Sequence, residues 1–95
     1  MSDQTTLTPA DVSAMAKRHT STAESISNQQ KTLDGNIQTL TSINKGAMMT
    51  KLTSVHTDWN TNTTKIVDTL REMATTLDSV AQRLQSQDEE SSSGL

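Results

Sequence analysis

The sequence contains no cysteine, tyrosine or phenylalanine, a single tryptophan, a single proline and three glycines. The absence of cysteine excludes disulfide frameworks and thiolate metal sites. Eight Lys and Arg residues against eleven Asp and Glu residues give a net charge of −3, so no basic surface for nucleic acid is expected. No window approaches the roughly 20 apolar residues of a membrane span, and the N-terminal stretch lacks the apolar core of a signal peptide. We therefore expect neither a transmembrane segment nor a cleaved signal peptide.

The sequence also lacks the motifs of catalytic sites. It has no Gly-rich phosphate loop and no nucleophile elbow, and its carboxylates are scattered over the predicted outer faces of helices. The two histidines, His19 and His56, would lie about 20 Å apart along the helical hairpin described below, at about 1.5 Å per residue. We therefore expect no catalytic residues, no cofactor and no metal site.

A chain of 95 residues with 31% hydrophobic residues has little apolar surface to bury. Small domains bury a smaller share of their surface than large ones and are marginally stable. We therefore expect a single domain that is completed by a partner.

Two regular series of residues predict two long helices. The first helix is predicted to begin after Thr8, which forms a capping box with Asp11. Pro9 then stands at the first helical position. In each series the residues follow one another at alternating intervals of four and three, as in a heptad seam. The first series is Val12, Ala16, His19, Ala23, Ile26, Gln30, Leu33, Ile37 and Leu40, and the second is Leu52, His56, Trp59, Thr63, Ile66, Leu70, Met73, Leu77, Val80 and Leu84.

The chain offers two places for the turn between these helices. Asp34-Gly35-Asn36 is the stronger local turn signal, but the first seam continues through Gly35 without a change of phase. The phase breaks between residues 41 and 51, beside Asn44-Lys45-Gly46. We therefore predict a tail at 1–7, a helical hairpin at 8–87 with its turn near 43–47, and a flexible acidic and Ser-rich tail at 88–95.

The predicted fold is all-α, a helix-turn-helix hairpin. Each helix carries one narrow apolar stripe, and pressing two stripes together leaves their edges open to water. A second hairpin, completing a four-helix bundle, closes these edges. The alternative is a monomeric two-helix coiled coil.

The chain resembles the small Trp-x-Gly (WXG) proteins exported by type VII (ESX) secretion systems of actinobacteria and related Gram-positive bacteria. Asn44-Lys45-Gly46 stands at the Trp-x-Gly position, with Asn in place of Trp. Leu84 and Asp88 stand at the ends of the family's C-terminal Tyr-x-x-x-Asp/Glu export motif, with Leu in place of Tyr. The resemblance covers residues 7–90.

The resemblance implies a non-enzymatic secreted protein that acts as a dimer, with a related hairpin as the favoured partner or with itself, in host or cell-surface interaction and virulence. It also implies a secretion ATPase as a partner, which docks on Leu84 and Asp88. The heptad spacing itself predicts a dimer and core seam from both helices. That seam comprises Ile26, Leu33, Ile37, Leu40, Leu52, Trp59, Ile66, Leu70, Met73, Leu77 and Val80. The alternative is a self-assembling structural hairpin, such as a type III secretion needle subunit.

Overall fold

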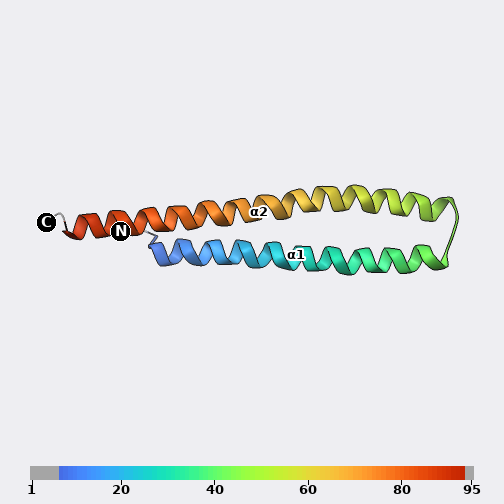
Figure 1. The fold of residues 1–95 in the computed structure, drawn as a ribbon, viewed down its shortest axis with the longest axis horizontal. Helices are drawn as coiled ribbons and strands as arrows, with labels where there is room; N and C mark the ends of the chain where they lie inside the picture. The colour runs from blue at the N-terminus through green and yellow to red at the C-terminus, as the bar shows by residue number, and fades with distance from the viewer. Residues whose placement is uncertain (1–6, 94–95) are drawn as a thin grey trace, which may run out of the picture.

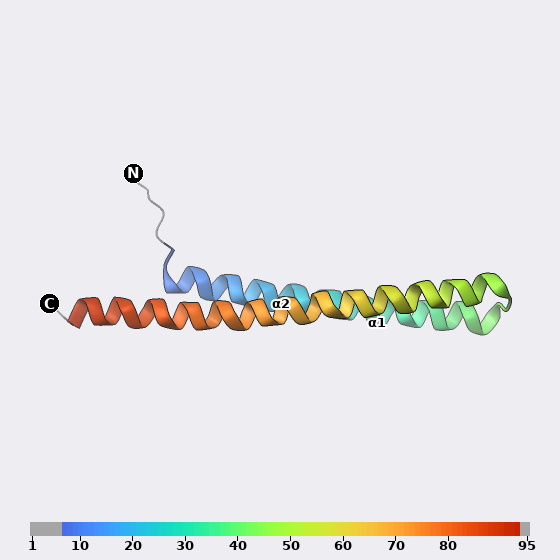
Figure 2. The same ribbon diagram turned by 90° about the horizontal axis from the view of Figure 1, so that it is seen from above.

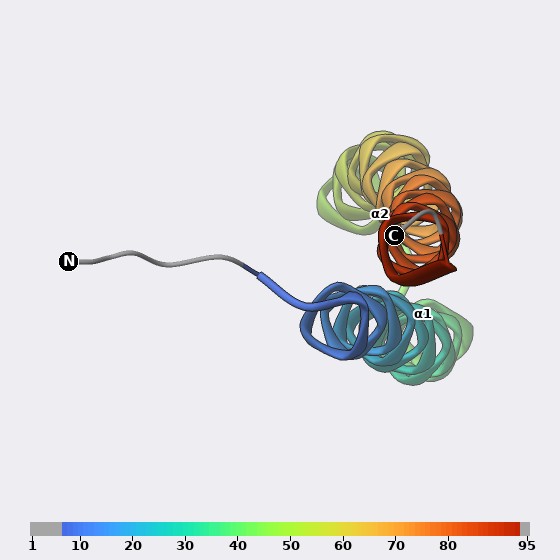
Figure 3. The ribbon, with the colours of Figure 1, turned by 90° about the vertical axis from the view of Figure 1, so that its left-hand side faces the viewer.

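The structure is a computed structural model that describes residues 7–93, with only the course of the backbone for 88–93. It consists of two long helices, α1 (Pro9–Ile43) and α2 (Ala47–Ser93), which run antiparallel and side by side (Figures 1 and 3). Seen from above, the helices cross at a shallow angle (Figure 2). The molecule is a rod of 74 × 25 × 16 Å. The predicted all-α hairpin is confirmed.

Helix α1 begins as its sequence predicts. The Thr8 side chain accepts a hydrogen bond from the Asp11 N–H at 3.1 Å, and the Thr8 N–H donates to the Asp11 carboxylate at 3.0 Å. Pro9 occupies the first turn, where its missing N–H costs nothing. Because the Thr8 N–H donates to the Asp11 carboxylate, the pKa of Asp11 lies below its ordinary value of 3.8. The capping box is therefore confirmed.

The helices are connected by Asn44, Lys45 and Gly46, within the predicted range of 43–47. The Asn44 N–H donates to the Leu40 carbonyl at 3.0 Å and closes α1. Gly46 has a φ of 123°, a conformation that residues with a Cβ atom rarely adopt, whereas Gly35 lies within α1. The change of phase in the hydrophobic pattern therefore located the turn better than local turn propensity.

Helix α2 is the longer of the two, with 47 residues against 35, and it extends past the start of α1 (Figure 1). The hairpin was predicted to end at residue 87, but the backbone of α2 continues to Ser93. Residues 88–93 contain neither Gly nor Pro, so no residue in that stretch breaks the helix. Of the predicted terminal tails, only Leu7 and the backbone of 88–93 lie within the described residues. Over those residues, no helix is both long enough and apolar enough to span a bilayer.

The interface between α1 and α2 is built from small side chains. The buried residues are Val12, Ala16, Ala23, Thr63, Val67, Ala74 and Ala81, and among the described residues no large side chain is fully buried. Small residues let two helices approach closely, but each removes little apolar area from water. The hairpin's own core is therefore thin.

The predicted α2 seam is displaced by one position along half of its length. The pattern placed Trp59, Ile66, Met73 and Val80 against α1, and all four are exposed. The residues that follow them by one position, Asn60, Val67, Ala74 and Ala81, face α1 instead. Leu33 and Leu40 of α1, which the seam also placed in the core, are exposed as well. Periodicity identifies a stripe, but it does not decide which side of a wide stripe faces the neighbouring helix.

A network of polar side chains joins the two helices in the part of the rod that is nearer the turn. The Gln30 side-chain amide donates to the Asn60 amide oxygen at 3.1 Å and to the Thr64 hydroxyl at 3.3 Å. The Asp34 carboxylate accepts from His56 Nε2 and from Asn60 Nδ2, each at 2.6 Å. Hydrogen bonds at fixed positions on both helices penalise any sliding of one helix along the other. The network therefore fixes the register of the hairpin.

Asp34 was predicted to lie on a solvated outer face, and the structure corrects this. Its side chain is 42% exposed, and that of His56 is 15% exposed, so the pair lies at the edge of the helix interface. The His56 and Asn60 hydrogen bonds hold the pKa of the Asp34 carboxyl below its ordinary value of 3.8. The ionised form of Asp34 is therefore the form that the fold stabilises.

Gly35→Ala should raise the free energy of unfolding by up to about 1 kcal/mol, because alanine is the better helix former. A Cβ atom at Gly35 would meet no atom within 4 Å, and Gly35 lies within α1. Gly46→Ala is the matched control: it also has open space, but its φ of 123° makes alanine strained there, so stability should fall. Urea unfolding followed by circular dichroism measures both effects, and a less stable Gly35→Ala variant would contradict the assignment.

Asp34→Asn should lower the melting temperature in a pH-dependent way. Because the folded-state pKa of Asp34 lies below 3.8, its contribution is complete above pH 3.8 and is lost as the pH falls through the folded-state value. The difference between wild type and variant should therefore be largest at neutral pH and should shrink in acid. Asp68→Asn, at an exposed position of α2, should leave the melting temperature unchanged. Equal melting temperatures for wild type and Asp34→Asn at pH 7 would show that the network contributes nothing.

Candidate functional site: an exposed apolar face

Exposed and half-buried side chains, most of them large and hydrophobic, form two rows with heptad spacing. The α2 row consists of Leu52, Trp59, Ile66, Met73 and Val80, and the α1 row consists of His19, Ile26, Leu33 and Leu40. Ile66 is 54% exposed and Trp59 is 38% exposed, although both are residue types that are usually buried. We call the two rows together the apolar face.

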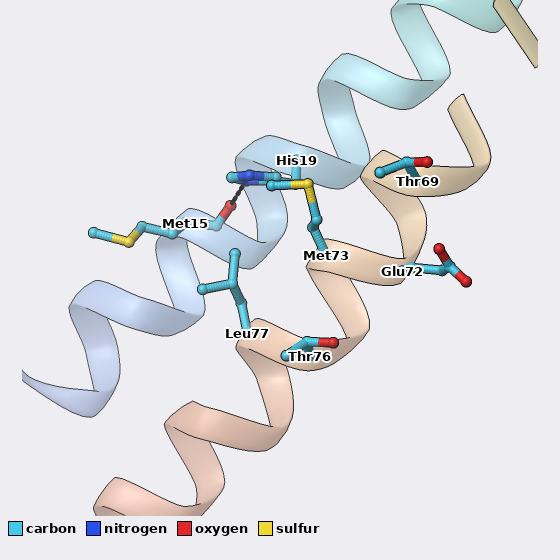
Figure 4. Close-up of a pocket in the computed structure, with 7 residues that line it drawn as sticks. All are labelled: Met15, His19, Thr69, Glu72, Met73, Thr76 and Leu77. Carbon is cyan, nitrogen blue, oxygen red and sulfur yellow. Dashed lines mark hydrogen bonds between the residues drawn. The ribbon is translucent and has the colours of Figure 1, made fainter. Parts of the chain in front are cut away.

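The two rows lie on the same side of the hairpin. His19 of the α1 row and Met73 of the α2 row line one open groove of about 410 Å³, together with Met15 and Leu77. In Figure 4, Met73 and Leu77 project from α2 toward the part of α1 that carries His19, whereas Glu72 projects away. Because residues seven apart return to the same side of a packed helix, the remaining members of each row share this side. The apolar face therefore extends along both helices.

His19 is held in one orientation within this groove. Its Nδ1–H donates to the Met15 carbonyl at 2.8 Å, as the dashed line in Figure 4 marks. The Nε2 atom is the remaining polar position of the ring. The groove is otherwise lined mainly by thioether and aliphatic groups, which adapt to irregular apolar surfaces.

Trp59 links the apolar face to the polar network. Its indole stacks on the His56 imidazole with ring centroids 5.3 Å apart and an interplanar angle of 27°. His56 in turn donates to Asp34 on the opposite side of the hairpin. The contact fixes one side of the indole and leaves the rest accessible to a partner.

The other predicted site residues are distributed as follows. Ile37, Leu70 and Leu77 are half-buried toward the helix interface. Asn44, Lys45 and Gly46 form the turn. Leu84 is half-buried near the end of the helix pair, and the side chain of Asp88 lies outside the described residues, although α2 continues through that position.

Two groups of residues were not predicted from the sequence. The row that faces α1, with Val67, Ala74 and Ala81, adjoins the predicted seam by one position and carries small side chains that give a weak hydrophobic signal. Asp34 was missed because its partners, His56 and Asn60, are distant in sequence. The signal that could have found the first group is the presence of two adjacent heptad rows on α2, which is typical of a helix that contacts two neighbours.

The apolar face has the features of a protein-binding surface. Contiguous apolar rows with polar edges mark interaction sites on soluble proteins. The groove is open, and aliphatic and thioether groups dominate it. Its shape and composition suit a second pair of helices.

Comparisons with known proteins agree with the hairpin fold. The chain matches the crystal structure of a point mutant of the secreted protein EsxB from Bacillus anthracis str. Sterne, with a TM-score of 0.81 and 19% sequence identity, over 93% of this chain and 97% of that chain. No curated protein matches the chain. The family WXG100, described as proteins of 100 residues with WXG, matches residues 4–89. The chain therefore belongs to the WXG100 family.

Proposed function

We propose that this protein is a non-enzymatic substrate of a type VII secretion system that is exported without a cleaved signal peptide and acts as a dimer of hairpins. The observation that carries the proposal is the apolar face on a hairpin of the WXG100 family. The name of EsxB, a secreted protein with the same fold, supports export. After export, the assembled bundle acts by contacts with host or cell-surface molecules.

The dimer completes a four-helix bundle. The interface between α1 and α2 buries mainly alanine and valine, whereas Leu33, Leu40, Ile66 and Met73 remain in contact with water. Each large aliphatic side chain contributes about 1.5–3 kcal/mol when it is fully buried. Pairing through the apolar face therefore supplies the stability that the thin core of one hairpin lacks. The partner is a related hairpin or a second copy of this chain.

The C-terminal part of α2 is the proposed docking segment for the secretion ATPase. Helix α2 extends past the start of α1, so this segment has less of the hairpin beside it than the rest of α2 (Figure 1). Leu84 and Asp88 are four residues apart, a spacing that places them on the same side of a helix. An apolar residue and an acidic residue at this spacing suit recognition by a groove that binds a helix.

Ile66→Asp should abolish dimerisation and reduce export, because it places a charge in the centre of the α2 row without touching the buried helix interface. Thr61→Asp, at an exposed position in the same helix, is the control and should leave both unchanged. Sedimentation velocity and the ratio of exported to retained protein measure the two effects. A dimer and normal export in the Ile66→Asp variant would overturn the assignment of the apolar face.

Leu84→Tyr should increase the exported fraction, because a phenol at this position adds a hydrogen-bonding group to the proposed docking segment. Gln85→Tyr adds the same group at the next position, which points in a different direction from the helix, and should not increase export. The measurement is the exported fraction in a strain with an active type VII system. Equal export of wild type and Leu84→Tyr would argue against recognition at Leu84.

A further inference from the structure

The groove on the apolar face brings together a thioether and an imidazole from two different helices. His19 of α1 and Met73 of α2 both line it, and in Figure 4 the Met73 side chain projects toward the part of α1 that carries His19. Met73 is 45% exposed and His19 is half-buried, so a small ion can reach both side chains from solvent. The groove therefore offers one sulfur and one nitrogen donor side by side.

His19 is oriented as metal-binding histidines usually are. Its Nδ1 lies 2.8 Å from the Met15 carbonyl oxygen, and because a carbonyl oxygen can only accept, Nδ1 carries the proton. In the neutral ring this leaves the lone pair on Nε2. Histidine ligands of metal ions commonly donate their other ring N–H to a carbonyl or a carboxylate, which fixes the tautomer and the direction of the ring. Nε2 of His19 is therefore prepared to act as a ligand.

The two donors select a soft cation. Thioether groups bind copper(I) and imidazole suits copper as well, whereas hard cations prefer carboxylate and carbonyl oxygens. The Glu72 carboxylate projects away from the groove in Figure 4. Over the described residues, no group of three or more His, Cys, Asp or Glu side chains could hold a metal ion. Copper(I) and silver(I) accept two donors in a near-linear arrangement, so they need no larger group.

The second histidine has different surroundings. His56 uses its Nε2 to contact Asp34 and stacks on Trp59. Its sequence neighbours within four positions include no methionine. The distance between the two histidines argues against a site that both would share, but it does not bear on a site formed by one histidine and one thioether.

We propose that His19 Nε2 and Met73 Sδ bind one copper(I) ion in this groove and so connect α1 to α2. Both donors belong to one hairpin, so the site needs no partner and goes beyond the proposed function. Ala16 and Ala74, which adjoin groove residues in the chain, are buried between the helices and supply little apolar area there. An ion that binds the folded hairpin, in which the two donors meet, and not the unfolded chain stabilises the hairpin.

Silver(I) is the probe, because it has the charge and the donor preference of copper(I) without its redox chemistry. In chloride-free buffer, silver should shift the NMR signals of the His19 ring and the Met73 methyl group and should raise the melting temperature. Met73→Leu and His19→Gln should each weaken silver binding by about tenfold or more, because each removes one of the two donors. Met48→Leu is the matched control, since Met48 is 72% exposed beside the turn, and it should leave silver binding unchanged.

Peroxide footprinting provides a readout that needs no variant. Hydrogen peroxide transfers one oxygen atom to a free thioether, which becomes a sulfoxide, and water is released. A sulfur whose lone pair binds silver reacts more slowly. Silver should therefore slow the oxidation of Met73 and leave the oxidation of Met48 unchanged, as measured by mass spectrometry of the peptides that contain them.

Unchanged silver affinity in Met73→Leu, or equal protection of Met48 and Met73 from peroxide, would overturn the site. Zinc binding as tight as silver binding would overturn the assignment to a soft monovalent ion. Leucine keeps an apolar side chain of similar volume at position 73, so pairing and export should persist in Met73→Leu. Failure of the metal site therefore leaves the proposed function intact, and failure of pairing or export leaves the metal site intact.

Discussion

The distribution of small and large side chains between two adjacent rows of each helix determines both the core between α1 and α2 and the apolar surface that the hairpin exposes. Alanine at positions 16, 23, 74 and 81 lets α1 and α2 lie close together, but it leaves little apolar area in their interface. Several of the larger side chains, among them Ile66 and Met73, lie on the neighbouring rows and face outward. A hairpin with the opposite allocation would be more stable alone and would have no surface for another hairpin. The marginal core and the interaction surface are therefore two consequences of one arrangement.

Much of the fold follows from the sequence. The capping box at Thr8 and Asp11 marked the start of α1, and an unbroken phase through Gly35 outweighed its strong turn propensity. The break of phase before Leu52 placed the turn at Asn44-Lys45-Gly46. These features are local or periodic, so a single sequence contains them. The end of α2 was less well defined, because serine and aspartate have only intermediate helix propensity and do not break a helix.

The assignment of faces could not be derived in the same way. A single seam with intervals of four and three describes a helix that packs against one neighbour. A helix in a four-helix bundle packs against two neighbours, which lie in directions about 90° apart when viewed down the helix axis. Trp59 and Ile66 lie on a row that is exposed in the single hairpin, and Val67 lies on the row that faces α1. The hydrogen bonds of Asp34 depend on the alignment of two distant segments, which periodicity does not provide. The WXG100 match favours the secreted-hairpin interpretation over the needle-subunit alternative that the sequence left open.

The stacking of Trp59 on His56 has a practical consequence for solution studies. Trp59 is the single tryptophan and the chain has no tyrosine, so its ultraviolet emission comes from one side chain. That indole borders the apolar face, and its imidazole neighbour is hydrogen-bonded to Asp34. One spectroscopic signal therefore reports on both surfaces of the hairpin. The protein therefore contains a built-in optical probe beside its apolar face, and binding of a partner to that face can be tested without a label.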